Sequence, residues 1–409
     1  MVGHATRQQL AEPLWFLQEA ELTAANEWLQ LPADALRALT AAAAEIRADE
    51  ALCKLAQEGR ALLFPEDASG ADTEDASGAG SGADAHAAGV SPYRAEVSDW
   101  IKRTGNKAAQ FIPLVLFSGL PRTIEQYKHY GIPKEVLVHT LSDLKLWMEH
   151  YYRKHGSWGT DIMWMHHHLT FQLFRLGRLQ FCWSRFNGHM VVLRNTKTSE
   201  VVVMAEGGIR FRRDGLIDGT SGRFESSDNG GGVWQSELLL EEAAIRGHRI
   251  NADGYASQAQ TTLSPREDWD IILRDGDSVL DIHVAADGKL DIRESGESLR
   301  EASRFFAQYF PEVGFRAYAC TSWLLDSQFR KLLAPTQNIV QFLNGFHLYP
   351  SANDGTEGLR RIFDGQLYAD WGDAPQDTSL RRIVRQHMMD GHSLRDMGGV
   401  ILPDDAVWQ

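Results

Sequence analysis

The sequence predicts an α+β or α/β protein in which a helical N-terminal domain precedes a domain built on a mixed sheet. Three observations carry this prediction. Apolar residues recur at helical spacing in the first part of the chain. After Asn187 and Gly188 the pattern changes to short runs typical of strands. The stretch from Val279 to Phe342 then follows the order strand, turn, helix, strand, helix.

Composition limits the classes of function. The 409 residues are 43% hydrophobic, which is enough for two or three domains with substantial cores. A net charge of −14 argues against nucleic acid as a partner, because that role needs clustered Lys and Arg. The three cysteines, Cys53, Cys182 and Cys320, are too far apart for a Cys-x-x-Cys metal site. No stretch reaches the roughly 20 apolar residues of a membrane span, so we expect a cytoplasmic protein.

The first domain is expected to cover residues 1–186. Leu14, Leu17, Leu22 and Leu29 begin an amphipathic helical pattern, and a second helix starts after Pro32. Residues 66–89 contain no large apolar side chain, so they are predicted to form a mobile acidic loop. Helical spacing resumes at Tyr93 and is broken at residues 131–133. A helix from Lys134 to Arg153 follows, and then a further segment of the pattern from Met163 to Phe181.

The second domain is expected to cover residues 187–409. Residues 190–193 and 201–204, separated by a polar turn, predict a β-hairpin. Residues 209–213 and 269–273 are further candidate strands, and residues 238–250 fit either a helix or a strand. Near the end of the chain we expect a helix over Ser379 to Met389 and a last strand over residues 399–402.

The most informative segment lies inside this second domain. Val279 to Val284 alternates apolar and polar residues and meets a turn at residues 285–288. Ser298 and Glu301 form a capping box that predicts the start of a helix. In the strand that follows, Tyr318, Cys320 and Ser322 share one face. A strand, crossover helix and parallel strand bind ligands at the carboxyl ends of the strands, which places a site near His283, Gly288, Ser322 and Trp323.

These residues also resemble a known family. Val-Leu-Asp-Ile-His-Val at 279–284, Ser-Leu-Arg-Glu-Ala-Ser-Arg-Phe-Phe at 298–306, Cys-Thr-Ser-Trp-Leu-Leu-Asp at 320–326 and Asn-Ile-Val-Gln-Phe at 338–342 are similar to the GNAT-like C-terminal domain of a two-domain bacterial N-acyltransferase family. The similarity is clearest over residues 269–349. It implies an N-acyltransferase-type N-terminal domain and a fold related to the Gcn5-type N-acetyltransferases. The implied reaction transfers an acyl group from acyl-CoA or acetyl-CoA to an amine.

A CoA-dependent enzyme needs a place for pyrophosphate. Free backbone N–H groups at a helix start often provide it, and Gly288, Lys289, Arg293 and Ser298 are the candidate cofactor-binding residues. The glycine-rich phosphate loop of the GNAT enzymes is not readable after His283, where residues 285–289 contain one glycine. A second function therefore stays open, a noncatalytic ligand-binding or regulatory module with the same fold.

Four residues are candidates for catalysis. His283 is expected to accept the proton of the attacking amine, because imidazole titrates near neutral pH. Tyr318, Cys320 and Ser322 are expected to line the acyl end or to protonate the leaving thiolate. The acceptor is expected to be a small amine or an amino-acid-like molecule, and the oligomeric state is left open.

Two further patterns bear on metal binding and on an acyl pocket. His166, His167 and His168 are adjacent, so on a helix their rings diverge by about 100° and cannot converge on one ion, and no metal is expected. The N-terminal half is rich in aromatic residues, from Trp147 to Phe186. These fit either an elongated pocket for an acyl chain or a helical core, and the usual burial of large aromatics favours the core.

Overall fold

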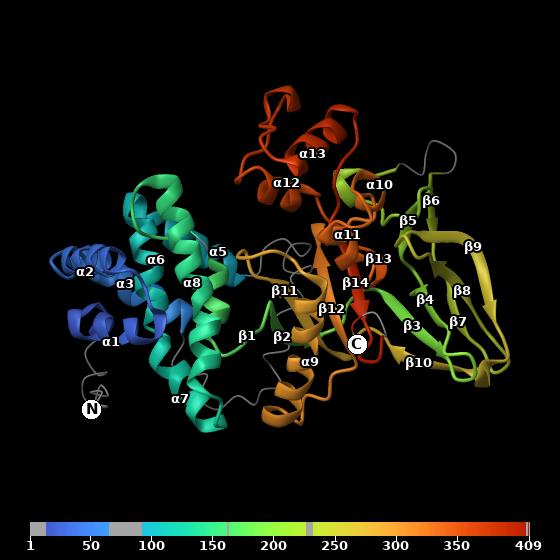
Figure 1. The fold of residues 1–409 in the computed structure, drawn as a ribbon, viewed down its shortest axis with the longest axis horizontal. Coiled ribbons are helices and arrows are strands. Elements are labelled where there is room, and N and C mark those ends of the chain that lie inside the picture. Colours follow the sequence, from blue (N-terminus) through green and yellow to red (C-terminus); the bar gives the residue numbers. More distant parts are fainter. Residues whose placement is uncertain (1–13, 65–91, 162, 226–231, 406–407, 409) are drawn as a thin grey trace.

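A computed structural model describes residues 14–64, 92–161, 163–225, 232–405 and 408. The acidic segment 66–89, predicted to be mobile, lies outside the described residues. Among the helices in these ranges, none is both long and apolar enough to cross a membrane. Figure 1 shows a helical region at one end of the molecule, sheets in the middle and at the other end, and two helices above them.

The N-terminal region is helical, as predicted. Its helices are α1 Glu19–Leu29, α2 Ala33–Arg47, α3 Glu50–Leu63, α5 Pro92–Thr104, α6 Ala108–Phe117, α7 Leu120–Tyr130 and α8 Lys134–His155. Trp100 is fully buried among them, and its indole N–H donates to the carbonyl of Leu55. Gly59 lies so close to this ring that a Cβ there would meet it at 2.3 Å. Close packing of this kind, rather than helix propensity, holds short helices together.

The predicted helical pattern from Met163 to Phe181 is wrong. The chain instead forms a short 3-10 helix, Met163–Leu169, and then the strands β1 Phe174–Leu176 and β2 Leu179–Arg185. Gly177 turns between them with φ +67, a left-handed conformation that glycine adopts without strain. All three residues of β1 are buried, so the alternation that marks a half-exposed strand is lost.

Two six-stranded sheets and a two-stranded ribbon form the rest of the framework. The first sheet has the order β1-β2-β11-β12-β14-β13, and the second has the order β10-β3-β4-β8-β7 with β9 paired to β8. The bounds are β3 Met190–Asn195, β4 Val201–Ala205, β5 Arg210–Arg212, β6 Val233–Gln235, β7 Leu238–Leu240, β8 Ile245–Ile250, β9 Ala256–Leu263, β10 Trp269–Leu273, β11 Ser278–Val284, β12 Ala317–Ser322, β13 His347–Pro350 and β14 Met397–Ile401. The predicted hairpin is thus β3–β4, and the ambiguous region 238–250 is two strands.

The strand–helix–strand unit is confirmed. β11 leads through α9, Ile292–Tyr309, to β12, and the two strands pair in parallel. Tyr318 and Cys320 belong to the large core that includes α9, whereas Ala317 and Ala319 belong to the core between the two sheets. The two faces of β12 are therefore assigned as their alternation predicts.

Four α-helices among the described residues follow this unit: α10 Phe329–Leu332, α11 Asn338–Leu343, α12 Thr356–Ile362 and α13 Ser379–Met389. Residues 351–396, which contain α12 and α13, connect β13 to β14 and form the upper part of Figure 1. The guanidinium of Arg361 lies 5.1 Å from the ring centre of Trp147 on α8, so this segment touches the N-terminal domain. The guanidinium of Arg395 lies 5.6 Å from the ring centre of Tyr255, beside the second sheet.

The predicted start of α9 is wrong. The helix begins at Ile292, and Asp291 caps it by accepting hydrogen bonds from the N–H groups of Arg293 and Glu294. Ser298 lies in the second turn, and its hydroxyl accepts hydrogen bonds from the N–H groups of Arg178 and Leu179. The capping-box spacing also occurs inside helices, and here an aspartate farther upstream provides the cap.

Replacing the cap tests this start of α9. We expect Asp291→Ala to cost about 1 kcal/mol and Asp291→Ser to cost much less, because serine is also a good N-cap. Hydrogen exchange at the amides of Arg293 and Glu294 measures the effect locally. Unchanged protection of both amides in the alanine variant would contradict the assignment.

Candidate functional site

The candidate site begins where the two central parallel strands separate. β11 and β12 pair only from Val279 with Ala317 to Asp281 with Ala319. Beyond that point β11 continues to Val284 along β2, and β12 continues to Ser322 along β14. Beyond this point the facing backbone edges of the two strands are thus left out of the ladder that joins them.

Glycines in β14 support this separation. A Cβ at Gly398 would meet the ring of Tyr349 at 2.1 Å, and a Cβ at Gly399 would meet the side chain of Phe346 at 2.9 Å. These aromatic side chains therefore lie directly on the backbone of the strand that holds the far half of β12. A larger residue at either position would push β14, and with it β12, out of line.

His283 lies at the far end of β11, on the face opposite α9. It pairs with Gln180 of β2 and shares its face with Asp281 and Cys182. The Cys182 sulfur lies 3.4 Å from His283 Nε2. From the N-terminal domain, the ring of Trp164 comes within 4.6 Å of the His283 ring, centre to centre, and within 4.4 Å of the His167 ring. The site is therefore built from both domains.

A buried acid–histidine pair from the N-terminal domain lies next to this face of the sheet. His168 Nε2 is 3.1 Å from Asp143 Oδ2, and both side chains are almost completely buried. The side-chain amide of Gln180 lies 3.3 Å from the same His168 nitrogen. Asp143 comes from α8, His168 from the 3-10 helix and Gln180 from β2, so this network joins the helical domain to the first sheet. Sequence reasoning missed it because its members are far apart along the chain.

The electrostatics of the site favour a neutral His283. Burial lowers its pKa to about 3, with further lowering by His167 and His168. Burial acts to raise the pKa of Asp143, but hydrogen bonds from His168 and Gln180 outweigh it and leave the pKa below its usual value. Asp143 is therefore anionic. Burial raises the pKa of Asp281 to about 6, so this carboxyl titrates just below neutral pH.

The other predicted catalytic residues do not gather around His283. The Tyr318 hydroxyl lies 2.7 Å from Ser303 Oγ and donates to the Leu299 carbonyl at 2.7 Å, which fixes it under α9. Cys320 is buried on that same face, and burial raises the pKa of its thiol to about 12. Ser322 lies at the end of β12, where its hydroxyl accepts a hydrogen bond from the N–H of Leu324. Of the four, His283 alone faces the junction of the two domains.

The predicted cofactor-binding residues differ in their exposure to solvent. Gly288 makes the turn after β11 with φ +66, and Lys289 and Arg293 are exposed beside it. Ser298, in contrast, is buried and already engaged by the β1–β2 turn. The first amides of α9 are occupied by Asp291, so they are not free for pyrophosphate.

Two arginines that sequence reasoning missed hold the loop after β11. Arg175 binds both carboxylate oxygens of Asp287 at 2.8 Å, and Arg178 donates to the carbonyls of Lys289 at 2.8 Å and Ala285 at 3.1 Å. Both guanidinium groups are largely buried. They share the carboxylate of Asp287, and Glu294, Glu297 and Glu301 line the depression beside them. The two residues flank a hairpin glycine, and nothing in that short motif reveals their distant partners.

Most of the N-terminal aromatic residues form the core. Phe171, Phe174, Phe181 and Trp158 are buried, which supports the favoured interpretation over an elongated acyl pocket. Trp147 and Trp164 are partly buried, and Trp164 is the one described above beside His283.

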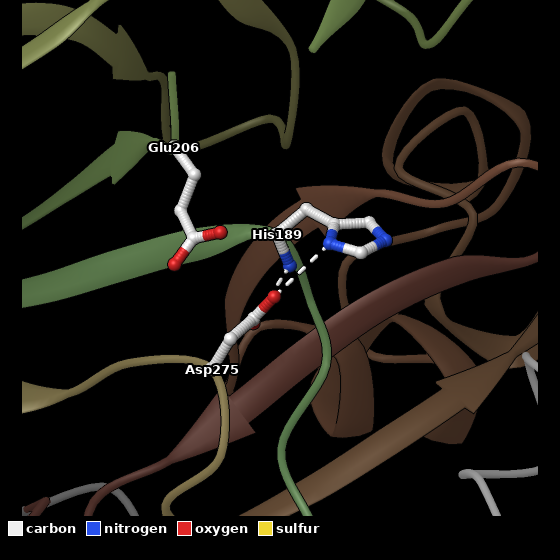
Figure 2. Close-up of side chains that lie close together, drawn as sticks. All are labelled: His189, Glu206 and Asp275. Atoms are coloured by element: carbon white, nitrogen blue, oxygen red, sulfur yellow. Dashed lines mark hydrogen bonds and ion pairs between the residues drawn. The ribbon is translucent and has the colours of Figure 1, made fainter. Parts of the chain in front are cut away.

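The histidine run and one other group bear on metal binding. His166, His167 and His168 contact the Leu63 carbonyl, Gln172 and Asp143 respectively, so their rings have different partners. Elsewhere in the described ranges, His189, Glu206 and Asp275 bring one ligand atom each within 4.8 Å of one another. Figure 2 shows Asp275 hydrogen bonded to both the backbone and the ring of His189. His189 precedes β3, Glu206 follows β4 and Asp275 follows β10.

Two family descriptions match the chain. The N-acyltransferase N-terminal domain matches residues 20–171, and the GNAT-like C-terminal domain matches residues 173–401. No curated protein matches the chain in sequence.

Solved structures of an acyltransferase are similar in fold. One holds decanoyl-CoA, is 21% identical, and covers 97% of this chain and 96% of its own with a TM-score of 0.56. Another holds decanoyl-CoA and teicoplanin, is 22% identical, and covers 93% of this chain and 87% of its own with a TM-score of 0.57. A third, a mutant of the acyltransferase orf11*, holds octanoyl-CoA, is 21% identical, and covers 93% of this chain and 87% of its own with a TM-score of 0.56.

The low pKa of His283 predicts a pH-dependent stability. Its pKa of about 3 lies below the usual 6.5, so its contribution is complete above pH 6.5 and is lost as the pH falls toward 3. Between pH 7 and pH 5 the wild type should lose about 2 kcal/mol that His283→Gln does not lose. Asp281 has a raised pKa, so its contribution makes the stability rise as the pH falls. This residue is present in both the wild type and the variant. Urea unfolding at both pH values measures the difference, and parallel pH profiles would contradict the assignment.

Removing the buried carboxylate tests the Asp143–His168 pair. Asp143→Ala is expected to cost roughly 3 kcal/mol or more, because it leaves His168 buried without its charge partner. The exposed pair of Arg103 and Glu58 is the control, and Glu58→Ala is expected to cost less than about 1 kcal/mol. Equal unfolding midpoints for the two variants would contradict a larger contribution of the Asp143–His168 pair to stability.

Proposed function

This chain belongs to the two-domain N-acyltransferase family, and we propose that it transfers a medium-length acyl group from acyl-CoA to a primary amine. The observation that carries the proposal is the separation of β11 and β12 beyond Asp281 and Ala319. It leaves unpaired backbone N–H and C=O groups beside His283, where a pantetheine arm can hydrogen bond and a thioester carbonyl can find a donor.

The reaction is a direct transfer. The neutral amine attacks the thioester carbonyl, an N–C bond forms, the C–S bond breaks, and the amine proton ends on the CoA sulfur. Attack places positive charge on the nitrogen and makes its N–H far more acidic than that of a free ammonium ion. A pKa of about 3 disfavours a protonated His283, so we assign the imidazole the role of relaying this proton toward the leaving sulfur, not of holding it.

The surroundings of His283 support its role. Trp164 packs against its ring and offers an apolar surface beside the reacting atoms. The Asp143–His168 pair is too deeply buried to touch a substrate, so we assign it a positioning role through Gln180, which pairs with His283 across the strands. Ser322, at the end of β12, is the remaining predicted residue near the opening.

The acceptor is proposed only as a class. An amine on a small amino-acid-like molecule fits the proposed attack, and so does an amine on a larger scaffold. A solved relative was crystallised with teicoplanin, which makes this glycopeptide one member of the test panel. The binding of octanoyl- and decanoyl-CoA by relatives supports a medium-length donor.

Release of CoA thiol tests the proposal. The wild type should release CoA from octanoyl-CoA when an acceptor amine is present, and the acylated amine should appear by mass spectrometry. Release without any amine product would indicate hydrolysis and would overturn the proposal. Absence of both octanoyl-CoA binding and turnover across the panel would leave only a noncatalytic module.

His283→Ala is expected to lower kcat by roughly 10²- to 10⁴-fold, the usual contribution of acid–base catalysis, with little change in KM for octanoyl-CoA. His347→Ala is the matched control, since His347 lies on β13 and pairs with Asp405. Melting curves of both variants exclude a folding defect. Retention of kcat within about threefold in His283→Ala would remove His283 from the reaction.

A further inference from the structure

Two connections between the first and the second sheet lie side by side. Residues 186–189 lead from β2 to β3, and residues 274–277 lead from β10 to β11. The N–H of Phe186 donates to the carbonyl of Asp277 at 2.8 Å, and the N–H of Gly276 donates to the carbonyl of Phe186 at 2.7 Å. His189 belongs to one connection and Asp275 to the other. A ligand held by both side chains would therefore fasten the joint between the two sheets.

Glu206 adds a third side chain to this joint. It follows β4, and its backbone N–H donates to the carbonyl of His189 at 3.0 Å. His189, Glu206 and Asp275 each offer one ligand atom, and these atoms lie within 4.8 Å of one another. Figure 2 shows the side chains of Glu206 and Asp275 pointing toward one another, with His189 beside them. Three adjacent strands, β4, β3 and β10, thus bring an imidazole and two carboxylates together at one end of the second sheet.

The spacing of the donor atoms suits a transition-metal ion. His189 Nδ1 lies 3.0 Å from Asp275 Oδ2. Two atoms bound to one Zn²⁺ ion at about 2.0–2.2 Å lie roughly 3.0–3.5 Å apart, so these two already have nearly the spacing of neighbouring ligands. The other carboxylate oxygen, Asp275 Oδ1, accepts a hydrogen bond from the backbone N–H of His189 at 3.0 Å. That bond fixes the orientation of the carboxylate, as the outer partners of metal ligands do.

Two carboxylates and one imidazole leave this group short of positive charge. In the part of the chain that the structure describes, no Lys or Arg forms an ion pair with Glu206 or Asp275. Burial and the negative charge of Asp275 raise the pKa of Glu206, so the two carboxylates oppose one another. One imidazole, even when protonated, balances a single carboxylate, whereas a divalent cation balances both. The side chains of His189 and Asp275 are 51% and 27% exposed, so an ion can reach them from solvent.

We propose that His189, Glu206 and Asp275 bind one Zn²⁺ ion that holds the joint between the two sheets. Three protein ligands of these types leave a fourth position to water. The imidazole nitrogen selects against Mg²⁺ and Ca²⁺, which take oxygen ligands. His189 and Asp275 are 86 positions apart, so no short motif indicates the site. The inference is separate from the acyl transfer proposed above.

Calorimetry with Zn²⁺ on EDTA-treated protein tests the ligands. The wild type should bind one ion per chain. His189→Ala and Glu206→Gln should each weaken binding by about 100-fold or more, because loss of an outer partner alone costs about 10- to 100-fold. His347→Ala is the matched control, since His347 also pairs with a carboxylate, that of Asp405, and it should keep the wild-type affinity. Equal affinity in the wild type and in His189→Ala would place the ion elsewhere and overturn the inference.

Thermal unfolding separates a specific site from a loose cluster of acidic residues. Zn²⁺ at about 100 times its Kd should raise the Tm of the wild type by about 4 °C or more, and Ca²⁺ at the same concentration should not. In Glu206→Gln the Zn²⁺-induced rise should disappear. Without metal this variant should melt at or above the wild type, because the substitution removes the repulsion with Asp275. Equal shifts with Zn²⁺ and Ca²⁺, or no shift with either, would overturn the inference.

Hydrogen exchange measures the effect on the joint itself. Zn²⁺ should slow exchange at the amides of Phe186 and Gly276, which bond the two connections together, in the wild type. The same ion should leave both amides unchanged in Glu206→Gln. Zn²⁺ binding by the wild type without added protection at either amide would overturn the role assigned to the ion.

Discussion

The end of pairing between β11 and β12 is the constraint on which the rest of the molecule depends. Once the shared ladder stops, the backbone N–H and C=O groups of each strand need hydrogen bonds elsewhere. β11 forms them with β2, and β12 forms them with β14. Such a sheet is stable only if both neighbours are firmly held. β2 is held by α9 through Ser298 and by the N-terminal domain through Gln180, whereas β14 is held under the rings of Phe346 and Tyr349.

Buried polar groups connect this framework to the helical domain. Asp143, His168 and Gln180 form a contact that no apolar pair would replace, because it fixes both the distance and the rotation between α8 and β2. The same surroundings keep His283 neutral. Stability and site chemistry thus depend on one set of interactions, and they rely on low exposure to water, where hydrogen bonds and charges act more strongly.

Much of the fold was predictable from the sequence because its signals are local. The helix Ser379–Met389 and the hairpin β3–β4 carry a clear period, and the alternation in β12 assigned Tyr318 and Ala319 to opposite faces. β1 and β2 were missed because buried strands lose that alternation. The start of α9 was missed because a capping motif at Ser298 competes in sequence with the true cap at Asp291.

The site was less predictable. His283 could be singled out because it ends a strand at a parallel crossover. Its neighbours could not, since Asp143, Trp164 and His168 come from elements that only tertiary packing brings to the sheet. The arginines of the β1–β2 turn were hidden for the same reason, because only their distant partner Asp287 reveals what they hold.

The segment 351–396 leaves the first sheet after Pro350 and returns at Met397, and these two residues are paired neighbours in the ladder. Because the two ends of this long excursion already touch, its exposed loops can change in length without moving the strands that it leaves and rejoins. The segment also contacts Trp147 of the N-terminal domain and Tyr255 beside the second sheet. A change in the segment therefore alters a surface that three parts of the molecule share. Length changes in these loops therefore alter the surface between the N-terminal domain and the second sheet and leave the pairing of β13 with β14 as it is.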